Sequence, residues 1–149
     1  KVVETKDIFE ALIVESQSDS RSAKLLLEGK EFSRSIYHSQ QAVEKAMKAA
    51  LVLTGTTITD DHWVSDRFMQ AFPEIPNIRN LIRDAKYLER QATKSRYPLF
   101  TNPEKPIWIP SHEYTELDGD DAYRKAIAIL KAIKQFLKEK HNISSTNLS

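Results

Sequence analysis

Residues Phe32 to Leu51, FSRSIYHSQQAVEKAMKAAL, decide the fold, because they contain neither glycine nor proline and repeat apolar side chains at helical spacing. The side chains recur mostly in steps of three and four residues, and the inner stripe consists of Ile36, Gln40, Val43, Met47, Ala50 and Leu51. This spacing predicts a helix from about Glu31 to Leu53. Gly55 stands where a left-handed cap would end that helix.

The residues before this stretch predict a second long helix, from Ile8 to Glu28. Its stripe of apolar or small side chains consists of Phe9, Leu12, Ile13, Ser16, Ser20, Ala23, Leu26 and Leu27. Gly29 supplies the C-terminal stop of this helix. Two long helices joined at one glycine predict an antiparallel hairpin.

Two further helices are predicted after Gly55. Residues 54–59 form a threonine-rich connection to a short helix, which Asp60 or Asp61 caps and Pro73 ends. The apolar residues of the short helix are Trp63, Phe68, Met69 and Phe72. A longer helix is predicted from about Asn77 to Lys94, on the spacing of Ile78, Leu81, Ile82, Ala85, Leu88 and Ala92, and the Tyr97-Pro98 step stops it.

A proline-punctuated loop, residues 96–117, precedes the last helix. We expect its apolar residues 107–109, Ile-Trp-Ile, to pack onto the helices. The acids of Asp118-Gly119-Asp120-Asp121 favour a helix N-terminus, and the last helix is predicted through about Lys140. Its buried face consists of Ala122, Ala126, Ile129, Ile133 and Phe136, widened by Tyr123, Ile127, Leu130 and Leu137.

These elements predict an all-α fold, an up-and-down bundle of four long helices plus one short helix. Residues 1–141 form a single domain in this interpretation, and the polar residues 142–149 form a frayed tail. The chain has 149 residues, of which 40% are hydrophobic, and 22 Lys and Arg against 21 Asp and Glu give a formal charge of +1. This balance excludes a protein that coats nucleic acid by bulk charge.

Cysteine is absent, which excludes disulfides, thiolate metal sites and cysteine nucleophiles and favours a reducing compartment. The sequence has no apolar run long enough to span a membrane, and residues 1–10 lack the layout of a secretory signal. We therefore expect a cytoplasmic protein without a membrane contact.

The motif search predicts no cofactor and no metal. The three glycines are isolated and each stands at a predicted helix end, so no glycine-rich phosphate loop is present. The histidines, His38, His62, His112 and His141, do not have the spacing of zinc or di-iron helices. A serine hydrolase would need a nucleophile elbow, which is also missing.

Charge arrangement leaves one candidate binding surface. Five cations on the fourth predicted helix follow at helical spacing and lead toward Arg96, and these are Arg79, Arg83, Lys86, Arg90 and Lys94. The stripe suits a phosphate backbone, although the preferred interpretation is a solvated helix face that Asp84 and Glu89 partly neutralise. Arg96 lies before the turn at Tyr97-Pro98, where it suits phosphate contact or the capping of helix carbonyls.

Several segments together resemble the HEPN domain (higher eukaryotes and prokaryotes nucleotide-binding). They are residues 32–51, with Gln-Gln-Ala-Val-Glu-Lys-Ala-x-Lys-Ala at 40–49 as the most specific block, then Asp61-His62, Ser95-Arg96-Tyr97-Pro98 and Asp121-Ala122. The resemblance covers about residues 8–140. It implies a bundle of four or five helices that commonly forms homodimers and is often encoded beside a minimal nucleotidyltransferase in prokaryotic toxin-antitoxin pairs.

Many members of that family are metal-independent ribonucleases, which the resemblance ties to an arginine followed, after four to six residues, by a histidine. This motif lies at the start of the loop before the last helix and is assembled in one cleft across the dimer. Arg96 matches the arginine, but the histidine window falls on Thr101, Asn102 and Pro103. His112 lies further along the loop. The resemblance therefore implies binding without this catalytic pair.

Three functional hypotheses follow. The leading one is a homodimeric, non-catalytic HEPN protein that binds a nucleotide, RNA or a nucleotidyltransferase partner near Arg96 and Tyr97. The second is a ribonuclease that uses Arg96 with His112 or His38 as the acid-base group. The third is a protein-interaction module whose contact surface holds Trp63, Trp108 and residues 107–109.

Overall fold

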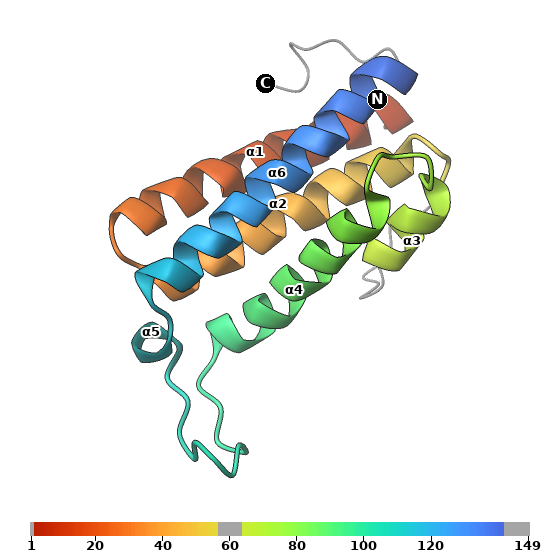
Figure 1. Ribbon diagram of the computed structural model, residues 1–149. Coiled ribbons are helices and arrows are strands. Elements are labelled where there is room, and N and C mark those ends of the chain that lie inside the picture. Colours follow the sequence, from red (N-terminus) through yellow and green to blue (C-terminus); the bar gives the residue numbers. More distant parts are fainter. Residues whose placement is uncertain (1, 57–63, 142–149) are drawn as a thin grey trace.

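A computed structural model describes residues 2–56 and 64–141 of the chain. The described residues form six helices (Figure 1), which are α1 (Thr5–Glu28), α2 (Phe32–Val52), α3 (Val64–Ala71), α4 (Ile78–Arg96), α5 (Pro110–Glu113) and α6 (Glu116–Lys140). The predicted all-α bundle is confirmed. Its four long helices are α1, α2, α4 and α6, while α5 is a second short helix that the sequence pattern did not predict.

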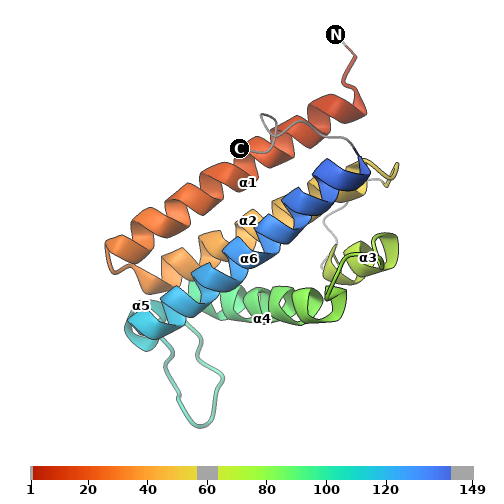
Figure 2. The ribbon, with the colours of Figure 1, turned by 45° about the horizontal axis from the view of Figure 1, so that its top comes forward.

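Helix α2 lies at the centre of the bundle. It contacts α1, α3, α4, α5 and α6, and Figures 1 and 2 show α1 and α6 covering one side of it while α4 lies on another. Every residue of its predicted inner stripe is buried, including the polar Gln40 at 6% exposure. The stripe is therefore packed against the neighbouring helices, as expected of the helix that the rest of the chain surrounds.

The turn between α1 and α2 confirms Gly29 as the residue that ends α1. Gly29 is the C-cap and has an ordinary φ of −80°, and the left-handed residue that follows it is Lys30, at φ 63°. The amide N–H of Glu31 donates to the carbonyl of Leu26, which closes the turn. The left-handed expectation at Gly55 is confirmed, with φ 81°.

Helix α6 begins earlier than the acidic run predicted. Thr115 is its N-cap, and a capping box joins the Thr115 side chain to the N–H of Asp118 and the Asp118 carboxylate to the N–H of Thr115. Gly119 is therefore the fourth residue of the helix and not a residue at its end. It is buried, and a Cβ there would meet Leu27 at 3.1 Å and Phe32 at 3.2 Å. Glycine lets α6 approach the α1–α2 turn closely.

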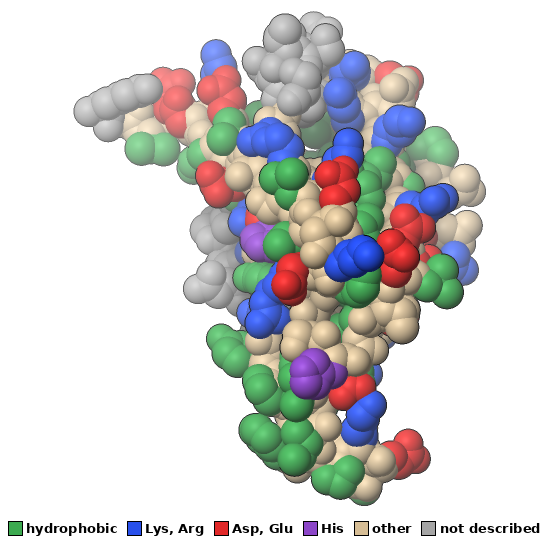
Figure 3. All heavy atoms as spheres, turned by 90° about the vertical axis from the view of Figure 1, so that its left-hand side faces the viewer, with side chains coloured by type: hydrophobic (Ala, Val, Ile, Leu, Met, Phe, Trp, Pro, Cys, Tyr) green, Lys and Arg blue, Asp and Glu red, His purple; other side chains and the backbone are tan. Residues whose placement is uncertain are grey.

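Residues 97–109 form an arm that projects from one end of the bundle (Figures 1 and 2). One antiparallel bridge, between Leu99 and Trp108, closes its base. The expectation that residues 107–109 pack onto the helices is wrong for Ile107, which is 58% exposed, and Ile109 is also exposed. Only Trp108 of the three is half-buried, with its ring edge against Tyr114. Figure 3 shows hydrophobic side chains gathered on this arm.

Helix α3 carries the second half of the predicted short helix, and Val64, Phe68 and the adjoining Phe72 are buried in the core. The predicted caps Asp60 and Asp61, together with His62 and Trp63, lie outside the described residues. In the described part of the chain, no helix carries an apolar run of the length needed to cross a bilayer.

Candidate functional site

The candidate site is a cavity of about 490 Å³ between α2 and α4, at the end of the bundle that carries the arm. It is lined by Tyr37, Gln40, Gln41, Glu44, Lys48, Glu89, Arg90, Ala92, Thr93 and Arg96. The two helices run antiparallel along it, since Tyr37 lies against Arg96 while Glu44 lies near Glu89. Tyr37 and Arg96 thus form one end of the cavity, and the two acids lie about two helical turns away.

Arg96 is the last residue of α4 and lies between two aromatic rings. Its guanidinium carbon is 5.5 Å from the ring centroid of Tyr37 and 5.9 Å from that of Tyr97. Tyr97 is 66% exposed and is therefore not buried under the loop. Among the described residues, Arg96 forms no ion pair. Cation–π contact holds the guanidinium in place without neutralising its charge.

Other side chains cap the C-terminal end of α4. The Arg34 guanidinium donates to the Ser95 carbonyl at 3.1 Å, and the Trp108 indole donates to the Lys94 carbonyl at 2.8 Å. These bonds occupy acceptors that a terminal arginine could otherwise take. Arg34 and Trp108 therefore cap these carbonyls in place of Arg96, and the Arg96 guanidinium faces the cavity.

His38 lies beside the cavity and does not line it. Its ring stacks on Tyr37 with centroids 5.3 Å apart, and its Nδ1 is 2.8 Å from the Asp19 carboxylate. Asp19 is only 8% exposed, and Lys45 pairs with its second oxygen. A buried carboxylate that holds one ring nitrogen leaves Nε2 as the atom through which His38 can act.

Tyr114 anchors the segment between the arm and α6 to the site helix. Its hydroxyl donates to the carbonyl of Gln91 on α4 at 3.2 Å, and burial raises the pKa of Tyr114 to about 12. The same ring packs edge-on against Trp108. Trp108 and Tyr114 therefore both fasten the loop between α4 and α6 to the site helix α4.

The two cavity carboxylates differ in their partners. Glu44 pairs with Lys48 at 3.5 Å and accepts a long hydrogen bond from Gln40. Glu89 accepts a hydrogen bond from the Ser65 hydroxyl of α3. Burial raises the pKa of Glu89, and the nearby Glu44 charge raises it further, against the lowering effect of Ser65 and Lys86.

The structure brings only some of the sequence-predicted residues together. Arg96, Arg90 and Tyr97 lie in or beside the cavity, with His38 one ring away. The remaining cations of the stripe are outside the cavity, namely Arg79, Arg83, Lys86 and Lys94, and His112 is exposed on α5. Lys86 pairs with Asp66 at 2.7 Å, which uses part of the stripe for structure.

Most of the stripe lies outside the cavity for a geometric reason, and Arg90 is the one member that contributes to the lining. Each residue turns an α-helix by about 100°, so Arg96, two positions after Lys94, points to a different face. Arg96 shares the inward face of α4 with Glu89 and Thr93.

Sequence reasoning missed the two acids and the glutamines of the cavity. The signal available for Gln40 was a polar residue within an apolar stripe, and Asp19 likewise falls on the buried face of α1. Glu44 and Glu89 gave no signal, because charged residues on helix surfaces are usually solvated.

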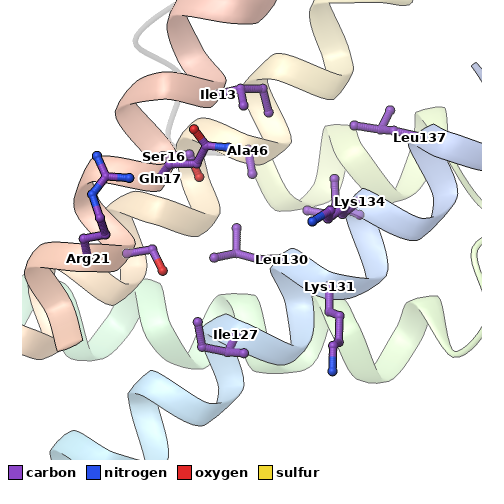
Figure 4. A pocket seen from close by; sticks show the side chains of 12 residues that line it. Ile13, Ser16, Gln17, Arg21, Ala46, Ile127, Leu130, Lys131, Lys134 and Leu137 are labelled. Atoms are coloured by element: carbon purple, nitrogen blue, oxygen red, sulfur yellow. The ribbon is translucent and has the colours of Figure 1, made fainter. Parts of the chain in front are cut away.

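A second cavity, of about 350 Å³, lies between α1 and α6 and is shown in Figure 4. Ala46 contributes to it from α2. Ala46 comes nine residues after Tyr37, which places it on the opposite face of α2. The close-up shows Ile13, Ile127 and Leu130 around its centre, with Arg21 and Lys131 nearer the edge. None of the described residues that line it is acidic or a histidine.

In the described ranges, no group of three or more His, Cys, Asp or Glu side chains is placed to hold a metal ion. The fold and the site define a class: a bundle of four long helices with a polar, arginine-containing cavity at the base of a loop arm.

The comparisons identify the family. Residues 9–140 match the model of the HEPN domain, and the chain belongs to this family. It is 37% identical over 138 residues to MJ1304 of Methanocaldococcus jannaschii, whose name describes a candidate toxin, with 88% of this chain and 89% of that protein aligned.

Two solved structures share the fold. TT1696 from Thermus thermophilus matches with a TM-score of 0.69 at 24% identity, covering 85% of this chain and 96% of that one. ST0689, described as an archaeal HEPN homologue, matches with a TM-score of 0.66 at 28% identity, covering 87% and 98%.

Proposed function

We propose that this protein is a non-catalytic HEPN protein of a toxin-antitoxin-like pair that binds the phosphate of a nucleotide or RNA in the α2–α4 cavity. The observation that carries the proposal is the state of Arg96. Its guanidinium is held between Tyr37 and Tyr97, carries no carboxylate partner among the described residues, and lines a cavity of about 490 Å³.

Arginine suits this role because its planar fork donates two parallel hydrogen bonds to a phosphate. Arg90 adds a second cation to the cavity lining. Aromatic rings on both sides restrict the guanidinium before a ligand arrives, which lowers the entropy lost on binding.

The test is the affinity of a fluorescently labelled single-stranded RNA, measured by anisotropy at several salt concentrations. We expect Arg96→Ala to weaken binding about tenfold or more and to reduce the salt dependence, because one phosphate contact is lost. Arg83→Ala is the matched control, since Arg83 is an exposed arginine of the same helix outside the cavity. Equal losses in both variants, or no loss in Arg96→Ala, would contradict the proposal.

A ribonuclease is the second candidate, and the His38–Asp19 pair favours it. Asp19 orients the ring, Nε2 would accept the proton of an RNA 2′-hydroxyl, and Arg96 would steady charge on the phosphate. The assay is RNA cleavage in EDTA by the wild type, Arg96→Ala, His38→Ala and His112→Ala. We expect intact RNA in all four. Cleavage lost in Arg96→Ala and in either histidine variant would establish the ribonuclease instead.

The partners proposed are a second copy of the chain and a minimal nucleotidyltransferase. The name of MJ1304 supports the toxin-antitoxin context. A pure interaction module is the remaining alternative, and the exposed apolar arm favours it. In that case Trp108→Ala would abolish capture of the partner protein. The wild-type protein would not bind RNA.

A further inference from the structure

The cavity contains more than a phosphate site requires. Glu44 and Glu89 line it together with Arg90 and Arg96, although carboxylates repel phosphate. A cavity for phosphate alone would gain affinity by losing both acids. Their presence indicates that the far part of the ligand brings hydrogen-bond donors and not negative charge.

The charges along the cavity are ordered. Tyr37 and Arg96 form one end, and Glu44 and Glu89 follow seven residues away on α2 and α4, about 10 Å along each helix. A ligand that spans the cavity therefore meets a cation without an acid at one end, and at the other end two carboxylates beside the cations Lys48 and Arg90. Between these ends the lining includes the uncharged polar residues Gln41 and Thr93.

Glu89 is the acceptor with capacity to spare. Glu44 is already engaged by Lys48 and Gln40, whereas the Ser65 hydroxyl reaches only the Oε1 atom of Glu89. Lys48 supplies donors beside these acids, because an ammonium group has three and Glu44 takes up one. Gln40 is buried in the same wall, and Gln41 donates to its Oε1 at 2.8 Å.

We propose that the cavity binds a guanine nucleotide, with its phosphate on Arg96 and its base edge on Glu89 and Lys48. The inference rests on the proposed function and names its ligand. The Watson–Crick edge of guanine presents two adjacent donors, N1–H and the N2 amino group, followed by the O6 acceptor. Glu89 accepts from the two donors and Lys48 donates to O6.

The other bases oppose this pattern. Adenine and cytosine place one amino group beside a ring-nitrogen acceptor, so a carboxylate facing that edge meets a lone pair. The N3–H of uracil lies between two carbonyl oxygens, which repel both carboxylate oxygens. A well-placed bidentate contact discriminates between bases by about tenfold or more, so guanine is the base selected.

The experiment is a titration of the ¹⁵N-labelled full chain with GMP, AMP, CMP and UMP, followed by amide chemical shifts. We expect GMP to bind about tenfold or more tightly than AMP, and Arg96→Ala to weaken all four nucleotides. Glu89→Met should abolish the preference for GMP over AMP without weakening AMP binding, which also reports an intact fold. Glu15→Gln, an exposed acid of α1, is the control for lost charge.

The outcomes separate the two proposals. Equal affinities for the four nucleotides that still depend on Arg96 would overturn guanine selectivity and leave phosphate binding in place. A preference for GMP that survives Glu89→Met would overturn the assignment of the base edge to Glu89. The absence of binding by any nucleotide or RNA would overturn both proposals.

Discussion

Glu89 shows at the scale of one residue how the proposed binding site would work against stability. Its carboxylate is taken out of water between α2, α3 and α4, and burial is the largest cause of its raised pKa. The folded protein therefore binds a proton at Glu89 more readily than the unfolded chain does. A residue chosen for stability alone at this position would be neutral.

Glu89→Gln should consequently stabilise the protein at neutral pH. The unfolded value is 4.5 and the folded pKa lies above it, so the free energy of unfolding falls as pH rises through that window. Glutamine removes this loss while keeping an acceptor for Ser65. We expect the melting temperature to rise at pH 7, with the difference disappearing below pH 4.5. Calorimetry at neutral pH and again below the unfolded pKa checks this, and a lower melting temperature at neutral pH would contradict it.

At the scale of elements, the start of α6 depends on one capping box. Thr115 and Asp118 satisfy backbone N–H groups that the first turn leaves without partners. The same turn contains Gly119, which packs against Leu27 and Phe32 of the first hairpin. The cap therefore sets where α6 meets α1 and α2.

Thr115→Ala should destabilise the protein by about 1 kcal/mol, the usual cost of losing a side-chain N-cap. Urea unfolding followed by circular dichroism measures the change. Thr101→Ala is the control, because Thr101 is an exposed threonine of the arm, outside any helix. A loss no larger than that of the control would mean that the backbone alone determines this helix start.

At the scale of the whole molecule, the arm is the segment that projects from the helical bundle (Figure 1) and exposes apolar side chains. Phe100 is 69% exposed, and the neighbouring apolar side chains of residues 97–109 are also exposed. Contiguous apolar surface on a small bundle marks a contact site. The arm is therefore where we place the contact of the proposed homodimer.

Phe100→Asp should weaken self-association about tenfold or more, because an aromatic side chain that the proposed dimer would bury is replaced by a charge. Analytical ultracentrifugation over a micromolar concentration series provides the measurement. Val14→Asp is the matched control, since Val14 is also exposed, at 56%, and lies in the middle of α1. A wild type that stays monomeric across the series would refute the dimer.

Helix boundaries followed from the sequence within a few residues, because apolar periodicity is a local property. Every residue of the stripe predicted for α2 is buried, although the buried surface of α2 is wider than that stripe, and the face of α6 from Ala122 to Phe136 is also confirmed. The errors concern places where a neighbour decides. Gly119 was predicted at a helix end, but it lies within α6 because it packs against the first hairpin. Ile107 was predicted to pack onto the helices, but none of the described helices covers it.

Spacing along the chain was enough to predict the helices and most of their buried faces, and the resemblance of short motifs predicted the family and identified Arg96 as a candidate. Which side chains share the site depends instead on how the helices pack. Glu44 and Glu89 lie on different helices and meet only because α2 and α4 pack antiparallel in one register. A one-residue change in that register would rotate Glu89 by about 100° out of the cavity, which no local pattern records.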